Sequence, residues 1–325
     1  MAIWTKLPAT EALVPRLYTG LRLYLTDQAA FAKRVEAGFK FLGQTQNLEQ
    51  RLTLLKNGWI SQAVFIAMVC GGESFSSGPL QFMWQRLIDE DVFVDMMSGV
   101  APGAYVSHQI ASERLVQLLA AEALPNIFRS PSALAETYSA SILAVDVVKS
   151  GQEFRGSGFI LNARGQHFVV TCKHNVDPGD DIESVKISDT QGRSIEIGGF
   201  TLHPSLDVAW SPLPSRHTGP TFCPGPASEM FDEVFTLGYP MIPGGLATLV
   251  GHRGEVNGYV DLYLAKTGAI LVSNLVSPGN SGCPVIRKDG LCVGMTIRWA
   301  EGEYGADKAR FSCALPIADI VADIS

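Results

Sequence analysis

The spacing of apolar residues divides the chain into a helical part and a β-rich part. Apolar residues recur at roughly every fourth position after Thr26-Asp27, at Phe31, Val35, Phe39 and Leu42. This spacing predicts an amphipathic helix that Thr26-Asp27 caps and Gly43 ends. Further helices are predicted over residues 47–55, 61–70, 79–89 and 106–124. Together they predict an all-α helical domain over residues 1–137.

The spacing of apolar residues changes from a helical to a β-type pattern after a connector with the sequence RSPS at residues 129–132. Residues 142–148 form a continuous β-type run, and turn residues then recur at intervals of about 8 to 12 positions. We therefore expect an all-β domain over residues 138–325. The predicted fold class is α+β and multidomain.

A serine lies in a glycine-containing turn between two apolar runs, in the sequence SPGNSGCP at residues 277–284. A serine hydroxyl becomes an effective nucleophile when a base removes its proton and N–H donors receive the resulting oxyanion. Gly279 permits a turn in which the amides of Gly279 and Ser281 converge as an oxyanion hole. Alone, such a string is also typical of an ordinary turn.

A base and an acid precede this serine in the chain. His174 follows the β-type run 167–171, and Asp207 precedes the apolar sequence VAW. Histidine can accept the proton of Ser281, and a carboxylate on its other nitrogen fixes its tautomer. Separately, His174 and Asp207 can be explained as ordinary polar residues at a strand end and in a turn. The order His174, Asp207, Ser281 is that of the chymotrypsin group.

Four segments carry a specific resemblance: GSGFIL at 156–161, TCKH at 171–174, LDVA at 206–209 and PGNSGCP at 278–284. They resemble the signature blocks of trypsin-like serine proteases, and they are most similar to the bacterial HtrA-type branch. FTLGYP at 235–240 and ALPI at 314–317 also match that branch. The resemblance implies a chymotrypsin-like fold of two six-stranded antiparallel barrels, with the triad between them. It implies no metal and no organic cofactor.

Four residues depart from the family pattern. Cys283 replaces a glycine after the nucleophile, and Cys172 and Lys173 replace small residues before the histidine. Asn280 stands where trypsin-type zymogens carry the aspartate that pairs with a newly cut N-terminus. Activation by N-terminal insertion is therefore not expected. The peptide-binding PDZ domain that usually follows an HtrA protease is also not expected.

The motif alignment further predicts a substrate pocket. Leu275 falls at the floor of the S1 pocket, and Thr296, Ile297 and Arg298 fall on its wall. A buried cation without a counter-charge is costly, so an apolar floor favours a hydrophobic P1 residue. If Arg298 turns inward, an acidic P1 residue is the alternative.

Composition limits the remaining function classes. The net charge of −7 argues against nucleic acid as a partner. The apolar run at residues 63–70 is far shorter than the ~20 residues of a membrane span, and no export signal opens the chain. We expect a soluble, cytoplasmic protein. Its six cysteines lack zinc-ligand spacing and are expected to be buried thiols.

The sequence thus predicts a cytoplasmic serine endopeptidase that acts on a protein or peptide. The helical domain has no evident catalytic residues and is expected to be regulatory or to bind a protein partner. A setting in bacterial stress or defence fits by analogy of domain organisation. The alternatives are a protease-fold interaction protein that has lost catalysis and an esterase with the same triad.

Overall fold

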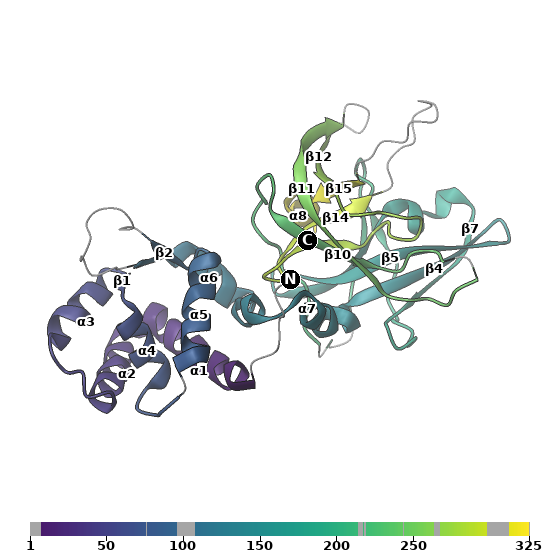
Figure 1. The fold of residues 1–325 in the computed structure, drawn as a ribbon. Helices are drawn as coiled ribbons and strands as arrows, with labels where there is room; N and C mark the ends of the chain where they lie inside the picture. Colours follow the sequence, from purple (N-terminus) through teal and green to yellow (C-terminus); the bar gives the residue numbers. More distant parts are fainter. Residues whose placement is uncertain are drawn as a thin grey trace. The chain divides into compact units, whose positions relative to one another are not determined.

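The protein folds into two compact units, Met1–Ser130 and Pro131–Ser325, in a computed structural model (Figure 1). The structure describes residues 8–75, 77–95, 108–213, 217, 219–242, 244–262, 267–297 and 312–324. The first unit ends before the predicted domain boundary at residue 137. The reason is that α7 (Pro131–Tyr138) packs on the β-rich unit, where the ring of Tyr138 stacks on Phe222 at 4.6 Å.

The first unit is mostly helical, as predicted. Its helices are α1 (Pro8–Thr26), α2 (Gln28–Phe41), α3 (Leu48–Lys56), α4 (Gln62–Cys70), α5 (Ser77–Asp89) and α6 (Ser112–Ala120), followed by a 3-10 turn over Leu124–Phe128. Asp27 caps α2 as expected, since its side chain accepts hydrogen bonds from the N–H groups of Ala29 and Ala30.

The helical unit also contains a three-stranded sheet that the sequence did not predict. Its strands β1 (Trp59–Ile60), β2 (Phe93–Asp95) and β3 (His108–Ile110) are ordered β1-β3-β2. The predicted helix over residues 106–124 is therefore wrong in its first part. His108 lies on β3, paired with Ile60 and Asp95, and the helical conformation begins only at Ser112.

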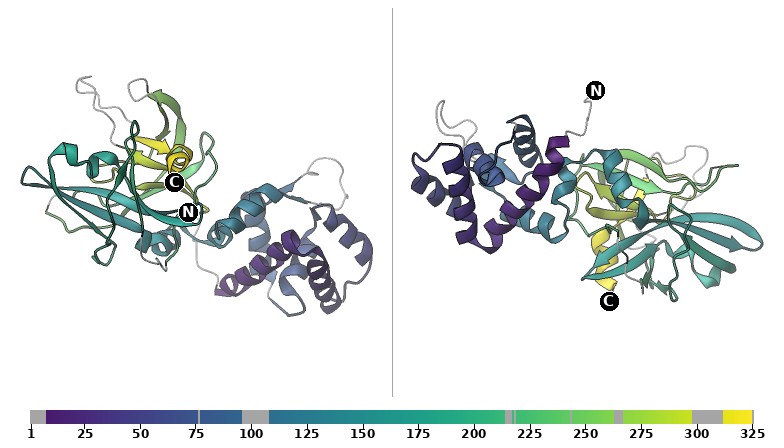
Figure 2. Two further views of the ribbon diagram at one scale, coloured as in Figure 1. Left: turned by 180° about the vertical axis from the view of Figure 1, so that it is seen from behind. Right: turned by 90° about the horizontal axis from the view of Figure 1, so that it is seen from below.

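The β-rich unit contains two six-stranded layers (Figures 1 and 2). The first sheet has the order β7-β4-β5-β6-β9-β8 and consists of β4 (Ile142–Lys149), β5 (Gln152–Ala163), β6 (Gln166–Thr171), β7 (Ile182–Ser188), β8 (Thr201–Leu202) and β9 (Ala209–Pro212). The second is a closed barrel in the order β10-β11-β12-β15-β14-β13, formed by β10 (Glu233–Gly238), β11 (Val250–Leu262), β12 (Thr267–Val272), β13 (Pro284–Arg287), β14 (Cys292–Ile297) and β15 (Ser312–Pro316). Helix α8 (Ile317–Asp323) follows. This arrangement confirms the predicted chymotrypsin-like architecture.

One apolar core connects the two layers. Phe159, Val170 and Trp210 of the first sheet belong to the same buried cluster as Leu237 and Met295 of the barrel. Because this burial removes apolar surface from water on both inner faces, the two layers stabilise each other. The loops at their junction are thereby held in fixed positions.

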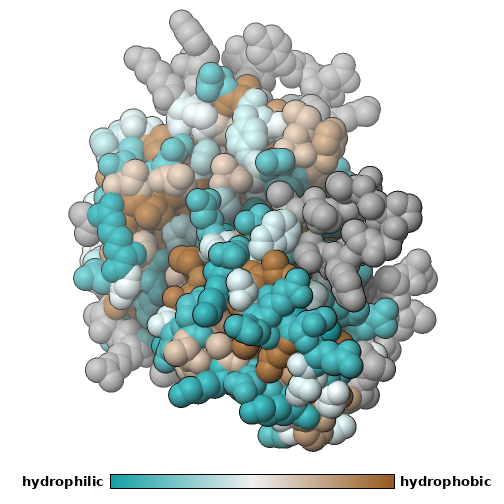
Figure 3. Space-filling model, turned by 90° about the vertical axis from the view of Figure 1, so that its left-hand side faces the viewer, coloured by the Kyte–Doolittle hydropathy of each residue, from teal (hydrophilic) through white to brown (hydrophobic). Residues whose placement is uncertain are grey.

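Among the described residues, no helix combines the length and the hydropathy needed to cross a bilayer. On the face drawn in Figure 3, hydrophilic and hydrophobic residues are interspersed.

Gly38 gives a test of the packing of α2 on α4. A Cβ atom at this position would lie 2.0 Å from the carbonyl oxygen of Ala67, a backbone atom that cannot move independently. We expect Gly38→Ala to lower the free energy of unfolding by about 1–3 kcal/mol, despite the better helix propensity of alanine.

The control is Gly78→Ala, at a glycine of α5 with open space around it. This variant is expected to be neutral or stabilising by up to about 1 kcal/mol. Urea denaturation of both variants measures the difference, and equal stabilities would contradict the packing account.

Candidate active site

The predicted nucleophile Ser281 lies on a turn between β12 and β13 that requires glycine at two positions. Gly279 and Gly282 have φ angles of 97° and 92°, which disfavour any side chain. A Cβ atom at Gly282 would also lie 2.1 Å from the carbonyl oxygen of Ser157. The glycines therefore set both the curvature of the turn and its close approach to β5.

Ser157 of β5 holds this turn in place. Its N–H donates to the carbonyl of Ser281 at 2.9 Å, and its hydroxyl donates to the carbonyl of Gly279 at 2.7 Å. The same hydroxyl oxygen accepts a hydrogen bond from the N–H of Tyr239 at 2.8 Å. Ser157 is fully buried, so these bonds do not compete with water.

His174 and Asp207 meet because β6 pairs with β9. Thr171, at the end of β6, lies opposite Ala209, at the start of β9, so the residues beyond these ends emerge at the same edge. The Nδ1 atom of His174 lies 2.7 Å from one carboxylate oxygen of Asp207. The N–H of His174 donates to the other oxygen at 3.0 Å. The carboxylate is thus fixed by two bonds to one residue, and Nε2 of His174 is left as the nitrogen available to a substrate or a hydroxyl.

The electrostatics favour an ionised Asp207. Burial alone would raise the pKa of its carboxyl. The hydrogen bonds from His174, the charge of the His174 ring and the nearby Cys172 thiol outweigh this effect and hold the pKa below the usual range. The carboxylate is then available to orient the imidazole and to stabilise its protonated form.

The Ser281 turn is also tied to the segment that carries His174. The side-chain amide of Asn175, the residue after His174, donates to the carbonyl of Ser281 at 3.2 Å and to Thr171 Oγ1 at 3.0 Å. The structure thereby brings His174 and Asp207 into contact and places the Ser281 backbone against their neighbour Asn175.

The N–H groups of Gly279 and Ser281, on either side of Asn280, have no acceptor among the described residues. The carbonyl of Pro278 accepts from the N–H of Met241 at 2.7 Å. Because the peptide bond is trans, the N–H of Gly279 points away from Met241. The amides of Asn280 and Gly282, by contrast, are bonded to Ser277 and Thr296. These are the two donors predicted for an oxyanion hole.

The predicted pocket residues have different environments. Leu275 is 65% exposed, whereas Thr296 and Ile297 are buried. The hydroxyl of Thr296 donates to the carbonyl of Asn280 at 2.6 Å, so it supports the turn that carries Ser281. Arg298 lies outside the described residues.

Three residues near the site form a cluster that could suggest a metal. One ligand atom each of Cys172, His174 and Asp207 lies within 4.8 Å of the others. However, burial and the neighbouring Asp207 raise the pKa of the Cys172 thiol well above its ordinary value, which disfavours the thiolate that a metal requires. The cluster fits hydrogen bonding better than metal binding.

Five of the six cysteines are buried, as the sequence predicted, whereas Cys223 is only partly buried. Cys283, which departs from the family pattern, is fully buried, and its sulfur lies 3.1 Å from Thr296 Oγ1. Burial raises the pKa of this thiol to about 12. The substitution therefore points into the core and leaves the solvent side of the turn unobstructed.

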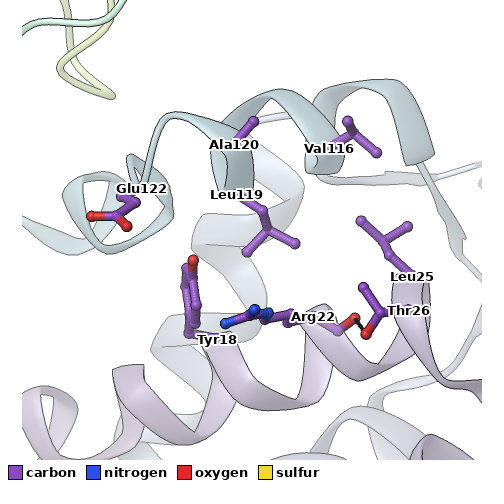
Figure 4. A pocket seen from close by; sticks show the side chains of 8 residues that line it. All are labelled: Tyr18, Arg22, Leu25, Thr26, Val116, Leu119, Ala120 and Glu122. Atoms are coloured by element: carbon purple, nitrogen blue, oxygen red, sulfur yellow. Dashed lines mark hydrogen bonds between the residues drawn. The ribbon is translucent and has the colours of Figure 1, made fainter. Parts of the chain in front are cut away.

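The helical unit has a hollow of its own, about 380 Å³ in volume, between α1 and α6 (Figure 4). Tyr18, Arg22, Leu25 and Thr26 of α1 line one side. Val116, Leu119 and Ala120 of α6 and the following Glu122 line the other. The lining combines apolar side chains with one residue of each charge.

Comparison with known proteins agrees with the geometry of the β-rich unit. Residues 156–295 match the family model described as a trypsin-like peptidase domain. This match confirms the predicted resemblance to trypsin-like serine proteases. No protein of curated function is similar enough in sequence to count as a match.

Solved structures similar to this chain include two proteases. The active form of the Rv3671c protease from M. tuberculosis has a TM-score of 0.48 and 18% identity, over 59% of this chain and 85% of that one. The HtrA-type protease AlgW with a tripeptide has a TM-score of 0.48 and 17% identity, over 60% of this chain and 62% of that one.

Sequence reasoning did not identify Ser157 and Asn175 as supports of the turn. Ser157 lies in the motif GSGFIL, whose resemblance to the family assigns no role to the individual serine. We expect Ser157→Ala to lower the free energy of unfolding by about 1–3 kcal/mol, because it removes a buried hydroxyl that serves two hydrogen bonds.

Ser228→Ala is the matched control, since Ser228 is also buried but its hydroxyl has no partner in the described structure. Its removal is expected to be neutral or slightly stabilising. Thermal denaturation of both variants measures the difference. An equal loss of stability in the two would argue against a stabilising role for the Ser157 hydrogen bonds.

Proposed function

We propose that the protein is a serine endopeptidase in which Ser281, His174 and Asp207 form the catalytic triad. The observation that carries the proposal is the pair of hydrogen bonds from His174 to Asp207, made beside a turn that leaves two amides open. The trypsin-like fold of the unit supports the same reaction class.

In this mechanism, Ser281 Oγ attacks the carbonyl carbon of the scissile peptide bond. His174 Nε2 accepts the hydroxyl proton and then donates it to the leaving amine, which gives an acyl-enzyme. Water repeats the sequence, and its attack releases the acid and returns the proton to Ser281. In this proposal Asp207 holds the ring with Nδ1 protonated, which leaves Nε2 to exchange the proton with Ser281.

The amides of Gly279 and Ser281 would stabilise the oxyanion of each tetrahedral intermediate. They are fixed before substrate arrives, because the carbonyls on either side of them are bonded to Met241 and Ser157. Preorganised donors of this kind contribute more than donors that must reorient during the reaction. All of these groups belong to the chain itself, so the mechanism requires no cofactor.

Exposed apolar side chains support a preference for an apolar P1 residue. Leu275 lies two residues before the Ser277 turn, and Met241 contacts that turn through its backbone. Both side chains are about half exposed or more, so they are available to meet a substrate. In this proposal Leu275, Ile297 and Arg298 line the substrate pocket, and the buried Thr296 supports its wall from behind.

We further propose that the helical unit binds a protein partner that regulates the peptidase, in the cytoplasm. The hollow between α1 and α6 supports this role, since its apolar lining and the Arg22 side chain suit a peptide segment. The net charge of −7 is consistent with a protein partner in place of a nucleic acid.

Ser281→Ala is expected to abolish peptide hydrolysis while leaving the melting temperature nearly unchanged. His174→Ala should be similarly damaging, and the double variant should be hardly worse, because triad members act as a unit. Asp207→Asn is expected to lower kcat by roughly 10⁴ through the wrong tautomer. Cleavage of a denatured protein substrate measures all four variants.

Ser277→Ala provides the control, since it removes a hydroxyl from the same turn without removing the nucleophile. Full hydrolysis by Ser281→Ala would overturn the mechanism. An intact, folded wild-type protein that cleaves esters but no peptide would favour the esterase alternative.

Cleavage of a denatured proteome is expected to show an apolar residue of modest size at P1. The reason is that a basic P1 side chain would find no carboxylate at Leu275. Mass spectrometry of the new termini identifies P1 directly. A dominant lysine or arginine would be incompatible with this pocket, and a dominant acidic residue would support the inward orientation of Arg298.

A further inference from the structure

The loop that carries Asp207 is closed by a buried histidine that the proposed mechanism does not use. Strands β8 and β9 pair as an antiparallel hairpin. His203 directly follows β8, and its N–H donates to the carbonyl of Val208, directly before β9, at 3.0 Å. Asp207 is therefore the last residue of the short hairpin loop 204–207. His203 itself is only 5% exposed.

The ring of His203 is bonded to this loop through one nitrogen and to α8 through the other. Its Nδ1 accepts hydrogen bonds from the N–H groups of Ser205 at 3.1 Å and of Leu206 at 2.8 Å. Its Nε2 lies 2.8 Å from a carboxylate oxygen of Asp323, the last residue of α8. The ring thus connects the loop before Asp207 to the helix that follows the barrel.

These bonds determine which ring nitrogen of His203 carries the hydrogen. A backbone N–H group can only donate, so the Nδ1 that faces two of them carries no hydrogen. The hydrogen of the neutral ring is then on Nε2, which donates it to Asp323. In turns of this kind the acceptor is commonly a side-chain oxygen of asparagine or aspartate, bonded to the N–H two residues further along the chain. Here Nδ1 of histidine takes that place.

We propose that His203 is a positioning residue, whose Nδ1 holds the loop in the conformation that presents Asp207 to His174. In this conformation the carboxylate receives both bonds from His174, at 2.7 and 3.0 Å. Leu206 is partly buried against the shared apolar core, so without Nδ1 its N–H would lose its partner in a partly dry environment. The loop would then rearrange to satisfy this group, and Asp207, the next residue, would move with it. The proposal deepens the proposed function and rests on it.

Two further contacts connect His203 to its surroundings without using Nδ1. The amine of Lys173, the residue before His174, lies 3.4 Å from the carbonyl oxygen of His203 and 3.9 Å from a carboxylate oxygen of Asp177. The ring of His203 packs edge-on against Trp210 of β9, with the ring centroids 6.3 Å apart. The loss of the acceptor can therefore be tested separately from the loss of these contacts.

The test compares two amide side chains at position 203 of the full-length protein. In His203→Asn, the side-chain oxygen can occupy the place of Nδ1 and accept from the same two N–H groups. In His203→Gln, the amide lies one bond further from the backbone, so it can meet Asp323 but leaves the two N–H groups without an acceptor. Backbone hydrogen exchange, followed by NMR, reports on the Leu206 N–H directly. It also reports on the His174 N–H, which is bonded to the carboxylate of Asp207.

We expect the N–H groups of Leu206 and His174 to exchange about tenfold faster or more in His203→Gln than in the wild-type protein. In His203→Asn both rates should stay close to the wild-type values. In an active enzyme, kcat is expected to fall about tenfold or more in His203→Gln with little change in KM, because the reacting groups are displaced and the substrate contacts are not. His203→Asn should retain most of kcat. If His203→Gln does not fold, His203→Phe replaces it, since phenylalanine keeps a ring beside Trp210 and has no acceptor.

His217→Gln is the matched control, because it makes the same replacement at another partly buried histidine, whose Nε2 lies 2.9 Å from Ser141 Oγ. It should leave exchange at Leu206 and His174 unchanged. An unchanged rate at His174 in His203→Gln, or an equal acceleration in His203→Asn or His217→Gln, would overturn the proposal. Exchange is read whether or not the protein hydrolyses peptides. An absence of cleavage, which would contradict the proposed function, is therefore distinct from failure of this inference.

Discussion

The hydrogen bonds between Ser157 and the Ser281 turn are the interaction on which the candidate site depends. They connect β5 of the first sheet to the loop that enters β13 of the barrel. The proposed nucleophile Ser281 and the His174–Asp207 pair belong to different β-layers, so their relative position depends on this connection. Two positive-φ glycines allow the approach, and the shared apolar core keeps the layers from separating.

The sequence predicted those parts of the site that depend on residue type and chain order. Ser281, His174 and Asp207 could be selected because a nucleophile, a base and an orienting acid each require a particular type of side chain. The contact between His174 and Asp207 then follows from the register of β6 with β9. Similarly, Asp27 could be identified as a helix cap because capping is a local interaction.

Features that depend on distant contacts were not predictable in the same way. The hydroxyl of Ser157 bonds to a carbonyl 122 positions further along the chain, and no local pattern indicates such a partner. His108 was expected on a helix but lies on a strand whose partners come from two separate segments. Helix α1 was not predicted, and it contains Pro15, which usually ends a helix. The roles of Leu275 and of the helical unit stay predictions.

The most direct measurement of the central claim is covalent labelling with a serine-directed phosphonate. Mass spectrometry of the intact chain and of its peptides would locate the adduct. The account predicts one phosphonate per chain, attached to Ser281 with Met1 still present, and no adduct in His174→Ala. A folded protein that takes up no phosphonate, or takes it up at another serine, would contradict the assignment of Ser281 as an activated nucleophile.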